Sequence, residues 1–121
     1  MPGRFFQNTI ALVYDFDGTL SPQPMQEYTV LPRMGVEPRE FWARVNEEAR
    51  RTESDMMLVY LRHILETLER QRIAVKREDF ARMARAIRYF PGVEGWFARM
   101  NAYVRARSGG RVKLHHYLIS A

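Results

Sequence analysis

Cysteine is absent from this sequence of 121 residues. Disulfide bonds and thiolate metal sites are therefore excluded, and the absence fits a protein of the reducing cytoplasm. No run of about 18 apolar residues occurs, so we expect no transmembrane helix and no contact with a membrane. Residues 1–6 also lack the long apolar stretch of a signal peptide. Hydrophobic residues nevertheless make up 46% of the chain, which predicts a packed core rather than disorder.

Acidic side chains are scarce in the second half of the sequence. Residues 1–60 carry a formal charge of −3 and residues 61–121 carry +8, which gives the overall +5. A basic half of this kind could attract nucleic acid or phosphorylated metabolites. The arginines recur at helical spacing rather than in one tract, which favours solvated helix faces. We therefore do not expect nucleic acid as a partner.

Two segments have the character of β-strands. Residues 9–14 form a short apolar run that ends at a polar turn containing glycine. Because the run is continuous rather than alternating, it predicts a strand buried on both faces, as in a parallel sheet. Residues 112–120 also have strand composition, and the Ser108-Gly109-Gly110 stop stands before them.

The residues between the strands are predicted to be helical. Apolar residues at helical spacing indicate helices that begin near Pro38 and that cover residues 57–68, 77–88 and 93–107. Thr52 or Ser54 is expected to cap the second of these helices. The order predicts an α/β fold, mostly helical by residue count, in which two parallel strands are separated by a large helical insertion.

Polar residues follow both predicted strands. Asp15 comes directly after the first strand and Ser120 ends the second. Parallel strands joined by a crossover place their carboxyl ends at one edge of the sheet, where α/β proteins bind ligands. We therefore expect Asp15 and Ser120 to lie at the same edge.

Residues 10–20 carry the most specific motif in the chain. An apolar strand leads into Asp15-Phe16-Asp17-Gly18-Thr19-Leu20. This pattern resembles the first motif of the haloacid dehalogenase (HAD) superfamily. The Pro91-Gly92-Val93 step, the helix after it and the strand ending at Ser120 resemble the approach to that family's second motif. The resemblance implies a partial Rossmann-like HAD core at residues 1–20 and 91–121, with a helical cap inserted at residues 21–90.

The resemblance also implies a reaction. The expected activity is Mg²⁺-dependent hydrolysis of a small phosphorylated metabolite through an aspartyl-phosphate, with Asp15 as the nucleophile. Asp17 would be the general acid and base, and its presence favours phosphate chemistry over dehalogenation. The implied Mg²⁺ ligands are the Asp15 carboxylate and the Asp17 backbone carbonyl. The implied phosphate-binding groups are Phe16, Gly18, Thr19 and Ser120.

The family's third and fourth motifs supply a basic residue and further acidic metal ligands after the second motif. Only Ala121 follows Ser120 here, so we expect this chain to be the N-terminal portion of a longer protein. As it stands, the chain should bind Mg²⁺ poorly and turn over slowly or not at all. Its open sheet edge and apolar sheet face should favour self-association.

Other interpretations remain open at this point. Asp15 and Gly18 suit a plain turn without catalysis. The basic second half suits a non-catalytic module that binds nucleic acid or an acidic partner. Within the insertion, Glu27, Arg33 and His63 are conceivable substrate contacts, although such residues are more often surface or capping groups.

Overall fold

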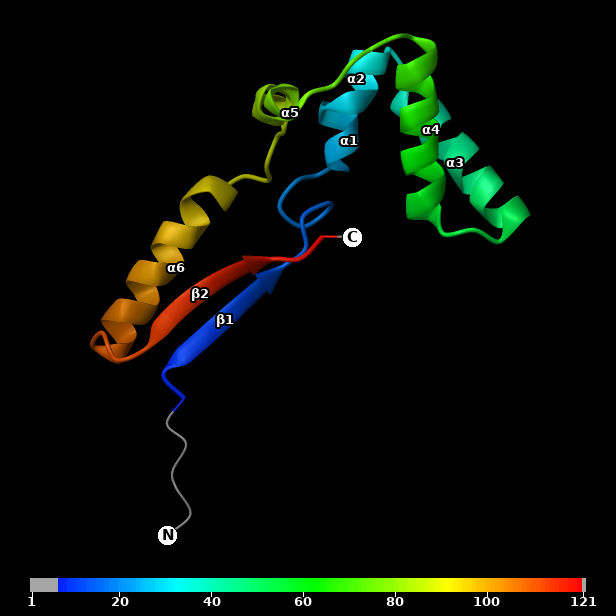
Figure 1. The fold of residues 1–121 in the computed structure, drawn as a ribbon. Helices are drawn as coiled ribbons and strands as arrows, with labels where there is room; N and C mark the ends of the chain where they lie inside the picture. Colours follow the sequence, from blue (N-terminus) through cyan, green and yellow to red (C-terminus); the bar gives the residue numbers. More distant parts are fainter. Residues whose placement is uncertain (1–6, 121) are drawn as a thin grey trace. The chain divides into compact units, whose positions relative to one another are not determined.

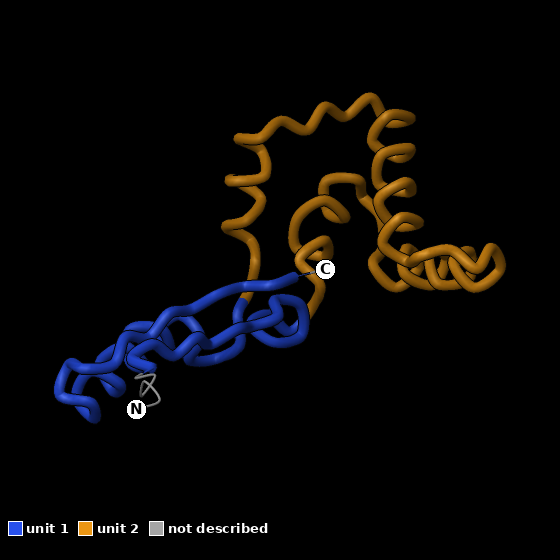
Figure 2. Tube along the Cα trace, turned by 60° about the horizontal axis from the view of Figure 1, so that its bottom comes forward, with its two compact units in different colours: residues 1–22, 89–120 blue, residues 23–88, 121 orange. Residues whose placement is uncertain are grey.

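The computed structural model describes residues 7–120, which form two compact units (Figure 1, Figure 2). The first unit combines the described residues up to Pro22 with Tyr89–Ser120, and the second unit is Gln23–Arg88. The chain therefore leaves the first unit shortly after its first strand and returns before the helix that leads to its second strand. The divisions fall after Pro22 and before Tyr89, whereas the sequence placed them after residue 20 and before residue 91.

The first unit is a small α/β structure. It contains strand β1 (Thr9–Tyr14), helix α6 (Val93–Ser108) and strand β2 (Lys113–Leu118). The strands pair in parallel from Thr9 opposite Lys113 to Tyr14 opposite Leu118. This confirms the α/β class, the two predicted strands and their parallel pairing.

The expectation that β1 is buried on both faces is wrong. None of its six residues is buried, and Val13 is 57% exposed. On β2, the residue opposite Val13 is Tyr117, which is 50% exposed. Burial on both faces requires helices on both sides of the sheet, and the described part of the first unit has the one helix α6, which packs on this sheet.

A chain of hydrogen bonds attaches α6 to the sheet. The Trp96 indole donates to the Tyr14 hydroxyl at 2.9 Å, and this hydroxyl lies 2.8 Å from Nδ1 of His116. Nε2 of His116 lies 3.1 Å from the amide oxygen of Asn101, so this nitrogen is the donor and Nδ1 accepts from Tyr14. The ring of Phe97 packs edge-on against Tyr14 and His116, at 5.6 and 5.1 Å between centroids.

The second unit is all helical and has its own core. Its elements are α1 (Met25–Tyr28), α2 (Val30–Met34), α3 (Pro38–Thr52), α4 (Met56–Arg70), α5 (Arg77–Met83) and the 3₁₀ turn η1 (Ala84–Ala86). The buried core comprises Val30, Leu31, Met34, Phe41, Val45, Val59 and Ile64. The predicted helices that begin near Pro38 and cover residues 57–68 are confirmed. Within residues 7–120, no helix is long and apolar enough to cross a membrane.

The N-cap of α4 differs from the prediction. Asp55 caps the helix, because its carboxylate accepts hydrogen bonds from the backbone N–H groups of Met57 and Leu58 at 2.8 and 3.4 Å. Thr52 is still part of α3, and its hydroxyl donates to a carbonyl one turn earlier in that helix. The expected caps, Thr52 and Ser54, therefore lie too early in the chain, because the capping position of α4 is Asp55.

The helix predicted at residues 77–88 is shorter than expected. α5 ends at Met83, the chain tightens into η1, and Ile87 is extended with φ −65° and ψ 129°. The first turn of α5 is held by Asp79, which is 6% exposed. The Asp79 carboxylate accepts the backbone N–H of Lys76 at 2.8 Å and pairs with Arg82. The hydrogen bond from the Lys76 backbone, helped by Arg82, lowers the pKa of Asp79 below its ordinary value.

Replacing Tyr14 with phenylalanine tests the attachment of α6 to the sheet. The Tyr14→Phe variant leaves the Trp96 donor and the His116 acceptor without their shared partner. We expect the free energy of unfolding to fall by about 1–3 kcal/mol in urea titrations. Tyr103→Phe is the control, since Tyr103 lies on α6 and is 57% exposed. Equal effects of the two substitutions would contradict this account.

Replacing Asp79 with asparagine tests the link between pH and the stability of the second unit. The folded-state pKa of Asp79 is depressed, so the ionised carboxylate stabilises the fold above its unfolded pKa of about 3.9. This contribution is lost as the pH falls from that value through the lower folded pKa. We expect Asp79→Asn to be less stable than the parent chain at pH 7, and the difference to shrink progressively below about pH 4. Denaturant titrations at several pH values measure it, and a difference independent of pH would refute the assignment.

Candidate functional site

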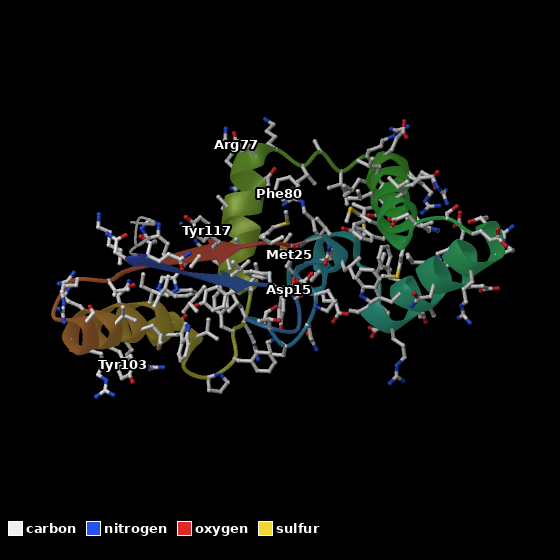
Figure 3. All side chains as sticks on the ribbon, turned by 90° about the horizontal axis from the view of Figure 1, so that it is seen from below. Asp15, Met25, Arg77, Phe80, Tyr103 and Tyr117 are labelled. Atoms are coloured by element: carbon white, nitrogen blue, oxygen red, sulfur yellow. The ribbon has the colours of Figure 1, made fainter. Side chains whose placement is uncertain are left out.

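Two carboxylates follow the carboxyl end of β1. Asp15 is the first residue after the strand and its side chain is exposed, as Figure 3 shows at the end of the β1 ribbon. Asp17 is partly buried two residues later. The carboxylates expected from the motif are therefore both in the turn that leaves the sheet, one of them open to solvent.

The turn folds around a single carbonyl oxygen. The carbonyl of Phe16 accepts backbone N–H groups from Thr19, Leu20 and Ser21 at 3.2, 2.9 and 3.3 Å. The N–H of Gly18 donates back to the Ser21 carbonyl at 2.8 Å. Gly18 adopts φ +78°, which residues with a side chain rarely adopt, so glycine suits this position.

The end of the turn is anchored, which the sequence did not indicate. Ser21 is completely buried and Leu20 is 6% exposed. The carbonyl of Leu20 accepts the N–H of Phe90 at 2.9 Å, which joins the turn to the segment before α6. Ser21 precedes Pro22 in the sequence, a position that by itself does not predict burial. The signal in the sequence that could have indicated its burial is its position directly after the Asp-x-Asp-Gly-Thr-Leu motif.

The ends of the two strands meet at one edge of the sheet. The N–H of Ile119 donates to the carbonyl of Tyr14 at 2.8 Å, so the pairing continues to the last residue before Asp15. Ser120 follows Ile119 and is exposed. The parallel register therefore brings Asp15 and Ser120 to the same edge, as their places in the sequence suggested.

The groups expected to bind phosphate are engaged to different degrees. The N–H of Phe16 donates to the Asp15 carboxylate at 2.8 Å, so this N–H reaches a phosphate oxygen only if the carboxylate turns away. The N–H of Gly18 is used inside the turn. Within residues 7–120, the hydrogen bond of Thr19 comes from its backbone rather than its hydroxyl. Ser120 follows the end of β2 and is exposed.

The oxygen donors expected for Mg²⁺ are few. Within residues 7–120, no three His, Asp or Glu side chains gather closely enough to hold a metal ion. The Asp15 carboxylate and the Asp17 carbonyl are hard oxygen donors of the type that Mg²⁺ prefers. If Mg²⁺ were bound here, these two groups would fill two of its six octahedral positions, and water and a substrate's phosphoryl oxygens would have to fill the others.

The polar side chains considered for the insertion make contacts within the second unit. Glu27 accepts the Trp42 indole N–H at 2.8 Å, and Arg33 donates to a backbone carbonyl before α5 at 3.5 Å. Nε2 of His63 lies 2.6 Å from the Glu48 carboxylate, and this hydrogen bond lowers the pKa of Glu48. These contacts account for the three side chains as parts of a helical scaffold.

Comparison with known proteins adds no relative. No protein-family model, curated protein or solved structure matches this chain. The arrangement at the sheet edge is therefore the observation on which a function rests.

Replacing Gly18 with alanine tests the conformation of the turn. A Cβ atom at Gly18 would meet nothing within 4 Å, so the effect comes from the positive φ alone. We expect a loss of about 1–2 kcal/mol in the free energy of unfolding, without a rearranged core. Gly95→Ala is the matched control, because Gly95 lies inside α6, where alanine is favoured by about 0.5–1 kcal/mol. Equal losses at both positions would contradict the assignment.

Proposed function

We propose that this chain carries the nucleophile of a Mg²⁺-dependent phosphomonoesterase of the HAD type that acts on a small phosphorylated metabolite. One observation carries the proposal: an Asp-x-Asp-Gly turn leaves the carboxyl end of a parallel strand, beside the end of a second strand that leads to Ser120. The exposed carboxylate of Asp15 is accessible to a substrate. The carboxyl edge of a parallel sheet is also where α/β proteins hold their ligands.

The proposed reaction has two steps. An oxygen of the Asp15 carboxylate attacks phosphorus, the ester bond to the leaving oxygen breaks, and Asp17 gives that oxygen its proton. Asp17 then takes a proton from water, whose oxygen attacks phosphorus and releases Asp15 and inorganic phosphate. The Ser120 hydroxyl donates a hydrogen bond to the phosphoryl oxygens. Mg²⁺, when bound, supplies positive charge that offsets the repulsion between the phosphoryl group and the carboxylate.

The second unit suits the role of a cap in this proposal. Gln23–Arg88 leaves the first unit just after the catalytic turn and contains its own buried helical core. A unit that folds around its own core can move as a body over an active site, which excludes water from the reaction and selects the leaving group. Loops and domains that close over substrates commonly have this independence.

A non-catalytic binding module is the second candidate, and one feature favours it. A cavity of about 430 Å³ lies between α6 and β2, and its lining includes Arg105, Lys113, His115 and Asn101. Two of these side chains are cationic, so the cavity suits an anionic group. Binding of a nucleic-acid backbone there would weaken steeply as salt rises, whereas catalysis would depend on Asp15.

Asp15→Asn tests the phosphatase proposal. Hydrolysis of an aryl phosphate is followed with and without Mg²⁺, using the 121-residue chain and the gene product translated to its stop codon. We expect Mg²⁺-dependent turnover in the gene product, and a loss of at least about a thousandfold when it carries Asp15→Asn, because an amide cannot act as the nucleophile.

The control is Asp55→Asn, which makes the same chemical change at the N-cap of α4 and keeps a good capping residue. It should retain the activity of the parent. Turnover that survives in Asp15→Asn, or that falls equally in Asp55→Asn, would refute the mechanism. Salt-sensitive binding of a labelled oligonucleotide without any hydrolysis would instead favour the binding module.

A further inference from the structure

An apolar cavity lies beside the candidate site, within the first unit. Its volume is about 320 Å³, at the lower end of the range for small-molecule sites. The residues that line it include Phe16, Tyr89, Val93, Glu94, Phe97 and Leu118. Rings and aliphatic side chains make up most of this wall, and among the described residues that line it Glu94 is the charged one.

The cavity is continuous with the catalytic turn. Phe16 stands between the two aspartates: its N–H donates to Asp15, while its side chain lines the cavity. The rings of Phe16 and Tyr89 meet edge-on with centroids 6.2 Å apart. Leu118 also lines the cavity, and it is the residue of β2 that pairs with the last residue of β1. The cavity therefore opens at the same edge of the sheet as the carboxylates.

The proposed reaction makes no use of this cavity for the phosphoryl group, which needs polar surroundings. In that reaction Asp17 protonates the leaving oxygen, and Asp17 directly follows Phe16. The group that protonates the leaving oxygen and a wall of the cavity therefore belong to the same turn. An apolar wall favours an apolar leaving group, because burying carbon releases water from both surfaces. The exposed Glu94 carboxylate repels a second anionic group on the substrate.

We propose that this cavity receives the organic part of the substrate, so that the enzyme selects phosphomonoesters whose leaving group is a compact aromatic or branched apolar body without a second negative charge. The proposal rests on the phosphatase function above and names the substrate class of that same site. Nucleotides with several phosphates and sugar bisphosphates should bind more weakly for the same reason.

Binding of non-hydrolysable phosphonates tests this inference without requiring turnover. Dissociation constants are measured by NMR titration for phenylphosphonate and methylphosphonate, on the gene product used in the activity test and with Mg²⁺ present. We expect the parent chain to bind phenylphosphonate about tenfold more tightly, a ratio in keeping with burial of part of the ring. Val93→Trp fills the cavity and should bring the two ligands to equal affinity, with methylphosphonate unchanged.

Ala102→Trp is the matched control, since it adds the same side chain at an exposed position of α6 outside the cavity lining. It should leave the tenfold ratio intact. Equal affinities for the two phosphonates in the parent chain would overturn the proposal, as would a ratio that survives in Val93→Trp. Tyr89→Ala removes one aromatic wall and should also lower the ratio, which keeps the test decisive if Val93→Trp fails to fold.

Glu94→Gln tests the exclusion of a second anion. At low salt, 4-carboxyphenylphosphonate should bind several-fold more weakly than phenylphosphonate to the parent chain, because exposed charges are weakly screened there. Glu94→Gln should remove most of that difference. A difference unchanged in Glu94→Gln would show that the carboxylate does not set this preference and would overturn that part of the proposal.

Phenol separates failure of the cavity from failure of the phosphatase. If neither phosphonate binds but phenol shifts the resonances of Tyr89 and Phe97 in the parent and not in Val93→Trp, the cavity is a binding site and the phosphatase proposal fails. If methylphosphonate binds and phenol does not reach these residues, the phosphatase proposal stands and the cavity proposal is overturned.

Discussion

Parallel pairing between β1 and β2 joins segments that lie far apart in the chain, and the candidate site depends on it. Tyr14 and His116 are 102 positions apart and are connected by a hydrogen bond in the sheet layer. Parallel strands cannot be joined by a tight turn, so the chain must cross over, and α6 provides that crossover. Only this pairing brings the turn after β1 to the end of β2. Closing so long a loop carries an entropic cost that the contacts of α6 must offset.

Those contacts are unevenly distributed between the two units. Seven buried hydrophobic residues form the core of the helical unit, whereas the α/β unit has Leu20 as its buried hydrophobic residue among those described. In the α/β unit, hydrogen bonds and ring contacts around Tyr14 supply stabilisation that buried apolar side chains supply in the helical unit. Directional contacts fix register more sharply than apolar burial, because each requires a particular partner. The geometry of the sheet edge therefore rests on a few specific residues.

The sequence predicted what local pattern controls. The strand at residues 9–14, the helix beginning at Pro38 and the stop at Gly109 follow from composition, spacing and capping chemistry, and all three are present. The prediction that β1 is buried on both faces was wrong, because burial depends on how many layers cover the sheet. A short stretch of sequence does not contain that information. The hydrogen bond between Tyr14 and His116 could be predicted only from the register of the two strands. Placement of Asp15 and Ser120 at one edge followed from topology, but the bond from the Phe16 N–H to Asp15 did not.

The alternation of side chains along β1 continues into the turn and gives its residues different tasks. Tyr14 packs against Phe97 of α6, and Phe16, two positions later, lines the same cavity as Phe97. Asp15, between them, is exposed. Successive side chains of an extended segment point to opposite faces, so an accessible carboxylate and a cavity wall fit on neighbouring residues but not on one. In the proposed enzyme, an aromatic residue between two aspartates would allow one short turn to carry both the reacting carboxylate and a wall for an apolar leaving group.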